Sequence, residues 1–218
     1  MRSFAIVAAL AATQAVASNI FRKCPLPEVQ QDFDVEAYTG LWYEQRRDTA
    51  DLFESSTGIC VTAQYFLNDN GTLRVLNNEY DDKKSKWGGG EGVATVVDPT
   101  KNEGYLTVKF NVFAPAGDYK VVETDYENYT VIYTCFGLAS ANIEYAWIMT
   151  RDANPTKEVM DKAYAAIATK IPKYDSSIKN FPATPQGDGA LKSGEACPYD
   201  SQPNAAMEAQ SFFASLLQ

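Results

Sequence analysis

The chain has 218 residues, of which 45% are hydrophobic, and its formal net charge at pH 7 is −9. Phosphate backbones and anionic membrane surfaces repel an acidic protein, so the composition argues against nucleic acid as a partner. The length suits one large domain or two small ones, and all-β barrels often occupy this range as a single domain.

The N-terminus has the pattern of a secretory signal peptide. Arg2 supplies a positive charge, residues 4–12 form an apolar run too short to span a bilayer, and Ala15-Val16-Ala17 matches the small-x-small cleavage pattern. We expect residues 1–17 to be removed, with a buried N-terminal helix as the alternative. The sequence therefore predicts a secreted, extracellular protein, although a plastid or endomembrane lumen stays open as a destination.

Four cysteines, Cys24, Cys60, Cys135 and Cys197, are widely spaced and include no CxxC pair. The spacing disfavours zinc and thioredoxin-like sites, and no metal is expected. An even number of cysteines in an exported chain predicts two disulfides, for which three pairings are open. The sequons at Asn70 and Asn128 are candidate glycosylation sites and also fit export.

The region from Gly40 to Arg151 reads as a succession of β-strands. Its segments are rich in Val, Ile, Thr, Tyr and Phe and alternate in polarity, and turn residues such as Asp98-Pro99 separate them. Strands at this spacing predict a sandwich or a barrel. The predicted strands are Gly40–Asp48, Gly58–Leu67, Thr72–Tyr80, Gly92–Val97, Gly104–Asn111, Tyr119–Thr124, Tyr129–Phe136 and Glu144–Arg151.

One amphipathic helix is predicted after the strands. Asn154 is a candidate cap, Pro155 suits the first helical position, and Pro172 stops the helix. Its apolar face is expected to pack on the strands from outside. Residues 18–38 and 174–197 are predicted as coil. The main domain is expected over residues 18–200, followed by a tail, 201–218, that forms a short helix, touches a membrane or is disordered.

Three motifs occur in order: Gly40-Leu41-Trp42 on the first strand, Thr124-Asp125-Tyr126 in a turn, and Arg151 after the last strand. Together they resemble the signature motifs of the lipocalin family, and the surrounding sequence resembles its apolipoprotein D-like and bacterial members. The resemblance implies an all-β fold, an eight-stranded antiparallel up-and-down barrel with one C-terminal α-helix packed on its outside. It also implies structural roles for Gly40, Trp42, Thr124, Asp125, Tyr126 and Arg151, with the Arg151 guanidinium over the Trp42 indole.

The same resemblance implies the disulfides Cys24–Cys135 and Cys60–Cys197. Each closes a loop of more than a hundred residues, which in the chain-entropy model adds roughly 4–5 kcal/mol. These bonds would tie the two terminal coils to the barrel. With all four cysteines paired, no thiolate nucleophile is left.

Candidate ligand-binding residues follow from strand alternation, since successive strand residues face opposite sides. If Trp42 faces inward, the inward set is Glu44, Arg46, Ala63, Tyr65, Val75, Asn77, Glu79, Val108, Phe110, Val112, Tyr119 and Val121, and Tyr145, Trp147 and Met149 share one face. The resemblance favours Tyr65, Asn77, Phe110, Tyr119 and Trp147, to which alternation adds Glu79. The alternative for each is core packing or, after a slip of one residue, the outer face.

The resulting hypothesis is reversible binding and transport of a small hydrophobic ligand, such as a fatty acid, sterol, retinoid, carotenoid or bilin. No cofactor is expected, and a monomer or weak dimer with transient membrane or lipoprotein contact fits the resemblance. Catalysis is the first alternative, but the chain has no histidine, and Glu44 and Glu79 would form a carboxylate pair only if both faced the cavity. The second alternative is lipid-stress protection by oxidation of Met160 or Met207.

Overall fold

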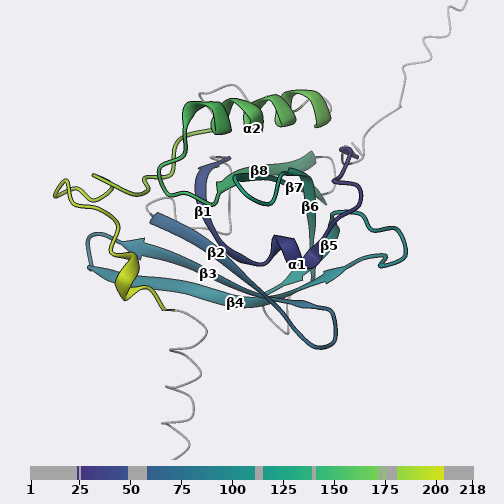
Figure 1. The fold of residues 1–218 in the computed structure, drawn as a ribbon, viewed down its shortest axis with the longest axis horizontal. Helices are drawn as coiled ribbons and strands as arrows, with labels where there is room; N and C mark the ends of the chain where they lie inside the picture. Colours follow the sequence, from purple (N-terminus) through teal and green to yellow (C-terminus); the bar gives the residue numbers. More distant parts are fainter. Residues whose placement is uncertain are drawn as a thin grey trace, which may run out of the picture.

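The computed structural model describes residues 24, 26–48, 58–110, 115–138, 141–171, 174 and 181–203. The predicted signal peptide and most of the predicted tail lie outside these residues. Eight antiparallel strands close into a barrel in sequence order, with one helix on the outside (Figure 1), which confirms the predicted fold. The elements are α1 (Val35–Tyr38), β1 (Gly40–Arg47), β2 (Ile59–Leu67), β3 (Leu73–Asp81), β4 (Lys86–Val96), β5 (Tyr105–Lys109), β6 (Gly117–Thr124), β7 (Tyr129–Leu138), β8 (Ala141–Thr150), α2 (Lys157–Lys170) and the 3-10 helix η1 (Tyr199–Ser201).

Alternation along the strands separates two apolar clusters. The inner cluster lies inside the barrel and includes Trp42, Tyr65, Leu106 and Ile132. The outer cluster covers the α2 side of β6, β7 and β8 and includes Val131, whose side chain faces away from that of Ile132. A third cluster, around Cys60, Tyr80 and Cys197, lies where the C-terminal coil packs on β2 and β3.

The helix α2 lies across the outer face of the barrel (Figure 1), packed against β6 and β7. Its buried residues are Ala163, Ala166 and Ile167, which belong to the outer cluster. The helical spacing of the apolar residues predicts Ala163 and Ile167 on this face correctly, but it also predicts Ala168, which is exposed, in place of Ala166. The predicted cap is wrong: the Val159 amide donates to Thr156 Oγ1 at 3.4 Å, so the helix begins at Lys157 rather than Pro155. Asn154 Oδ1, the predicted capping atom, instead accepts from the amide of Asp188 at 3.4 Å.

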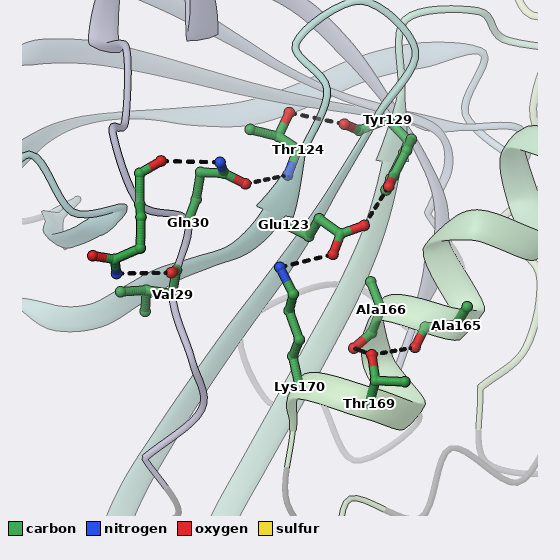
Figure 2. A network of polar contacts seen from close by, with 10 residues as sticks. Val29, Gln30, Glu123, Thr124, Tyr129, Ala165, Ala166, Thr169 and Lys170 are labelled. Carbon is green, nitrogen blue, oxygen red and sulfur yellow. Dashed lines mark hydrogen bonds and ion pairs between the residues drawn. The ribbon is translucent and has the colours of Figure 1, made fainter.

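A polar network joins the C-terminal end of α2 to the strands (Figure 2). Lys170 Nζ lies 2.8 Å from the carboxylate of Glu123 on β6. The same carboxylate accepts a hydrogen bond from the hydroxyl of Tyr129 on β7. Burial alone would raise the pKa of Glu123, but the hydrogen bonds from Lys170 and Tyr129 outweigh it and lower the pKa below its ordinary value.

All eight strands differ from their predicted bounds, most of them by one to three residues at an end, and β4 differs most. The strand β4 begins at Lys86 rather than Gly92, because Gly88–Gly92 pair residue by residue with β3 despite their poor strand propensity. The strand β5 ends at Lys109, before the predicted end at Asn111. Because glycine is rare in strands, the sequence did not predict the first half of β4 and its pairing with β3.

A short helix, α1, interrupts the predicted N-terminal coil and lies at one end of the barrel. The Asp34 carboxylate caps it by accepting from the amides of Glu36 and Ala37 at 2.9 and 3.0 Å. Its last residue, Tyr38, is fully buried in the inner cluster. We call this end of the barrel the closed end and the opposite end the distal end.

The structure contains the two disulfides that the resemblance implied, Cys24–Cys135 and Cys60–Cys197. The second anchors a C-terminal coil beside the distal half of β1, beyond Tyr43, where the pairing of β1 with β2 ends. There the Gln186 side chain donates to the carbonyls of both Glu44 and Val61, at 2.8 and 2.6 Å. The coil thus bridges the two separating strands, and this packed chain continues to Gln202, which is buried and bonded to Thr62.

Candidate functional site

The closed end is built around Arg151 and Trp42. The guanidinium lies 3.7 Å from the centre of the Trp42 ring. It donates to the carbonyls of Leu41, Thr39 and Tyr126 at 2.9, 2.8 and 3.0 Å. Burial lowers the pKa of Arg151 relative to its ordinary value. Because these donors are engaged with backbone carbonyls, the geometry gives Arg151 a structural task.

The turn that contains Thr124, Asp125 and Tyr126 is stabilised by its own side chains. The Asp125 carboxylate accepts from the amides of Asn128 and Tyr129 at 2.7 and 3.0 Å. Burial opposes this, yet these bonds lower the pKa of Asp125 below its ordinary value. Tyr126 takes a positive φ of 65° and its hydroxyl accepts from the amide of Asp34. The motif therefore holds the N-terminal segment against the closed end.

Gly40 is required at the point where β1 leaves α1. Its φ is +94°, and a Cβ there would lie 3.1 Å from Arg151 Nη1. Glycine both adopts this left-handed conformation and leaves room for the guanidinium.

Three tyrosine hydroxyls form a polar layer above the closed end. Tyr119 lies 2.7 Å from the hydroxyl of Tyr65 and 3.0 Å from that of Tyr38, which also contacts Thr130. Burial raises the pKa of Tyr38 to about 12, and burial also raises the pKa of Tyr119 well above its ordinary value. The hydroxyls of Tyr38 and Tyr119 therefore stay protonated at neutral pH, and the layer can exchange hydrogen bonds with a bound molecule.

In the part of the barrel wall formed by β3 and β4, β3 has inward side chains and the paired residues of β4 are glycines. Val75, Asn77 and Glu79 follow the inward phase on β3, and their register partners on β4 are Gly92, Gly90 and Gly88. A Cβ at Gly88 would meet no atom within 4 Å, and one at Gly90 would meet only Phe110, at 4.0 Å. This part of the wall is therefore open toward the barrel interior.

Phe110 lies at the distal rim rather than deep inside. Its side chain is 49% exposed, and the ring lies against Gly92, where a Cβ would approach Phe110 Cδ1 to 2.8 Å. The inward phase places it beside the glycine face. Val112, its predicted neighbour along the chain, lies outside the described residues.

The prediction that Arg46 faces inward is wrong. A β-bulge between Glu44 and Arg46 shifts the register, so Arg46 pairs with outward-facing Ile148 and Arg47 pairs with inward-facing Trp147. A bulge inserts one residue and reverses the phase of everything beyond it. The inward residue is therefore Arg47, whose Nη1 lies 3.5 Å from the buried Glu44 carboxylate.

Two inward-facing polar atoms are buried without a hydrogen-bond partner among the described residues, Asn77 Oδ1 and Trp147 Nε1. Buried polar atoms in native proteins are nearly always paired, so such an exception requires an explanation. A bound molecule with polar groups would supply the missing partners. Sequence reasoning identified both residues, but it missed the open glycine face and the Glu44–Arg47 pair. The Gly-rich run was the only sequence signal for the glycine face, and the Glu44–Arg47 pair depends on a bulge that the strand pattern did not predict.

The two sequons have different surroundings. Asn70 is exposed at the β2–β3 turn, and Thr72 Oγ1 donates to its Oδ1 at 2.7 Å. Asn128 Nδ2 donates to Asp125 at 2.8 Å, and Thr130 is fully buried beside Tyr38.

Two hollows lie outside the barrel, with volumes of about 570 and 440 Å³. They share Ala153–Pro155 and contain none of the six predicted ligand-binding residues. Within the described part of the chain, no three histidine, cysteine or acidic side chains are grouped to hold a metal ion. No helix in that part is long and apolar enough to span a membrane.

Comparisons with known proteins agree on one family. A family model described as a lipocalin-like domain matches residues 33–178. Over 142 residues the chain is 37% identical to apolipoprotein D of Macaca fascicularis, which covers 64% of this chain and 71% of the relative. It is 36% identical over 132 residues to the outer membrane lipoprotein Blc of Vibrio cholerae, covering 60% of this chain and 72% of the relative.

A solved structure, insecticyanin from Manduca sexta, has a similar fold. The TM-score is 0.63 at 23% identity, and the match covers 83% of this chain and 94% of insecticyanin.

Proposed function

Because the chain belongs to the lipocalin-like family, we propose that it binds and transports a small hydrophobic ligand inside its barrel. The observation that carries this proposal is the open β4 face at Gly88 and Gly90, which lies opposite inward side chains on β3. An apolar chamber with a few convergent polar groups is the usual form of a ligand site. An eight-stranded barrel can hold one small ligand, and the family suggests a fatty acid, sterol, retinoid, carotenoid or bilin.

The residues that we propose to contact the ligand share the barrel interior or its distal rim. Tyr119 and Tyr65 supply hydroxyls at the closed end of the chamber, and Phe110 supplies an apolar rim. Asn77 and Trp147 offer the buried polar atoms that lack a partner. The full proposed set is Tyr65, Asn77, Glu79, Phe110, Tyr119 and Trp147.

We assign no catalytic step to this site. Glu44 and Glu79 both follow the inward phase, but Glu44 is engaged by Arg47 at 3.5 Å and by the hydroxyl of Thr184. A general base needs a free carboxylate within reach of a substrate proton. For lipid protection by oxidation, Met160 is partly buried against the outer cluster, and Met207 lies outside the described residues.

We also propose that the protein is exported. The signal-like N-terminus and two disulfides support this, since disulfides persist in oxidising compartments.

The proposed function is tested by native mass spectrometry of the mature chain after incubation with a lipid extract from its host. We expect one bound lipophile per chain, released on unfolding. A chain that retains no lipophile would contradict the proposal.

A further inference from the structure

Three charged side chains converge in the distal half of the barrel, and their charges do not cancel. Glu44 on β1 is 1% exposed and lies 3.5 Å from Arg47 Nη1. Glu79 on β3 is the third. Two carboxylates and one guanidinium leave a net charge of −1. An uncompensated charge in a partly desolvated site is costly, which favours a partner of opposite sign.

Glu79 is placed by the close approach of Gly58, the residue before β2. A Cβ on Gly58 would lie 2.3 Å from Glu79 Oε2, so the carboxylate rests directly on this buried glycine. Arg47 Nη2 donates to the Gly58 carbonyl at 3.4 Å and so approaches the same point. Among the described residues Glu79 nevertheless has no ion-pair or hydrogen-bond partner, in contrast to Glu44.

A second acceptor stands beside this carboxylate. Asn77 precedes Glu79 by two residues on the same inward face of β3, so their Cα atoms are about 7 Å apart along the strand. Its Oδ1 is buried and has no donor within the described structure. Both groups therefore need hydrogen-bond donors, and one of them also attracts positive charge.

There is room for a ligand group at this point. The β4 residues paired with Glu79 and Asn77 are Gly88 and Gly90, whose inward sides are open. The Phe110 ring lies at the edge of this opening, and an aromatic face attracts cations. The net charge of −9 would also draw cations toward the barrel.

We propose that Glu79 and Asn77 form a subsite for a protonated amine at the end of an apolar ligand. The ammonium N–H groups donate to Glu79 and to Asn77 Oδ1, and the apolar body lies along the glycine face toward the tyrosine layer. This inference rests on the proposed function, because it names the head group of the ligand that the barrel carries.

Three sixteen-carbon probes that differ only in their head group test the proposal: hexadecylamine, hexadecanol and hexadecanoic acid. Each is titrated below its micelle concentration against the mature chain loaded with Nile red, a neutral dye, and the displacement gives Kd. We expect the amine to bind about tenfold more tightly than the alcohol and the acid to bind most weakly, in line with charge-assisted hydrogen bonds.

The matched variants are Glu79→Gln inside the barrel and Glu127→Gln in the exposed turn at the closed end. Glu79→Gln should abolish the preference for the amine, so that the amine no longer binds more tightly than the alcohol, and retained Nile red shows that the chamber is still folded. Glu127→Gln should keep the preference. Tighter binding of the acid, or an amine preference that survives in Glu79→Gln, overturns the proposal. If none of the three probes binds, the proposed function itself fails, and this inference fails with it.

Discussion

The Arg151 guanidinium lies between the Trp42 ring, 3.7 Å from its centre, and the carbonyl oxygens of the chain that closes the barrel. One side chain thus joins α1, β1 and the turn before β7. A planar fork with five donors is needed for this arrangement, and a lysine ammonium cannot reproduce it.

Replacing Arg151 by lysine should therefore destabilise the protein. The loss of the cation–π contact and of several carbonyl hydrogen bonds should lower the free energy of unfolding by about 2–4 kcal/mol. Urea denaturation monitored by circular dichroism measures it. Lys157→Met is the control, since this lysine is 86% exposed and its loss should cost under about 0.5 kcal/mol. An equal effect of both variants would contradict the structural role of Arg151.

The bulge in β1 gives a second test, because neighbouring arginines have opposite surroundings. Arg47→Met leaves the buried Glu44 without its guanidinium, and breaking a buried pair costs about 3 kcal/mol. Arg46→Met changes the outward neighbour and should cost under about 0.5 kcal/mol. The same urea titration measures both losses. A larger loss for Arg46→Met than for Arg47→Met would mean that Arg46 faces inward and that β1 has no bulge.

A side chain on the open face of β4 should block the chamber. Gly90→Leu places a side chain where a Cβ meets only Phe110, so Nile red or hexadecanol binding should weaken at least about tenfold with little loss of stability. Thr95→Leu, at an exposed position on the same strand, is the matched control and should bind normally. Unchanged binding in Gly90→Leu would place the ligand elsewhere.

The Glu123–Lys170 pair predicts a pH-dependent contribution to stability. Because the folded pKa of Glu123 is lowered, the contribution is present above the ordinary glutamate pKa of about 4.3 and is lost as pH falls through the folded value. Glu123→Gln should therefore cost about 0.5–1 kcal/mol at pH 7, given its partial exposure, and nothing in strong acid. Urea midpoints of both chains between pH 2 and 7 test this. A difference that persists at pH 2 would show that the effect is not ionic.

Glycan attachment should favour Asn70 over Asn128. The Thr72 hydroxyl lies beside the exposed Asn70 side chain, as the acceptor sequence requires, whereas Thr130 points inward to Tyr38. In chain secreted from eukaryotic cells, Asn70→Gln should remove most of the glycan mass and Asn128→Gln little of it. The opposite result in intact-mass spectra would mean that modification precedes folding of the closed end.

Sequence patterns predicted much of this architecture. Alternating β-branched and aromatic residues indicated the strands, and the helical spacing of residues such as Ala163 and Ile167 indicated the buried face of α2. The three motifs implied the closed barrel, together with the disulfides Cys24–Cys135 and Cys60–Cys197 that the structure contains. These features are local or are carried by short motifs, so a single sequence is enough to recognise them.

Only the tertiary structure decided what the interior presents. The bulge after Glu44 turned Arg47 rather than Arg46 toward the interior. The register between β3 and β4 placed Gly88 and Gly90 opposite Glu79 and Asn77. Both outcomes depend on how neighbouring strands slide and twist against each other, which no period within one strand encodes. The sequence by itself therefore determined that a barrel forms, whereas packing between strands determined which charges and which open space lie inside it.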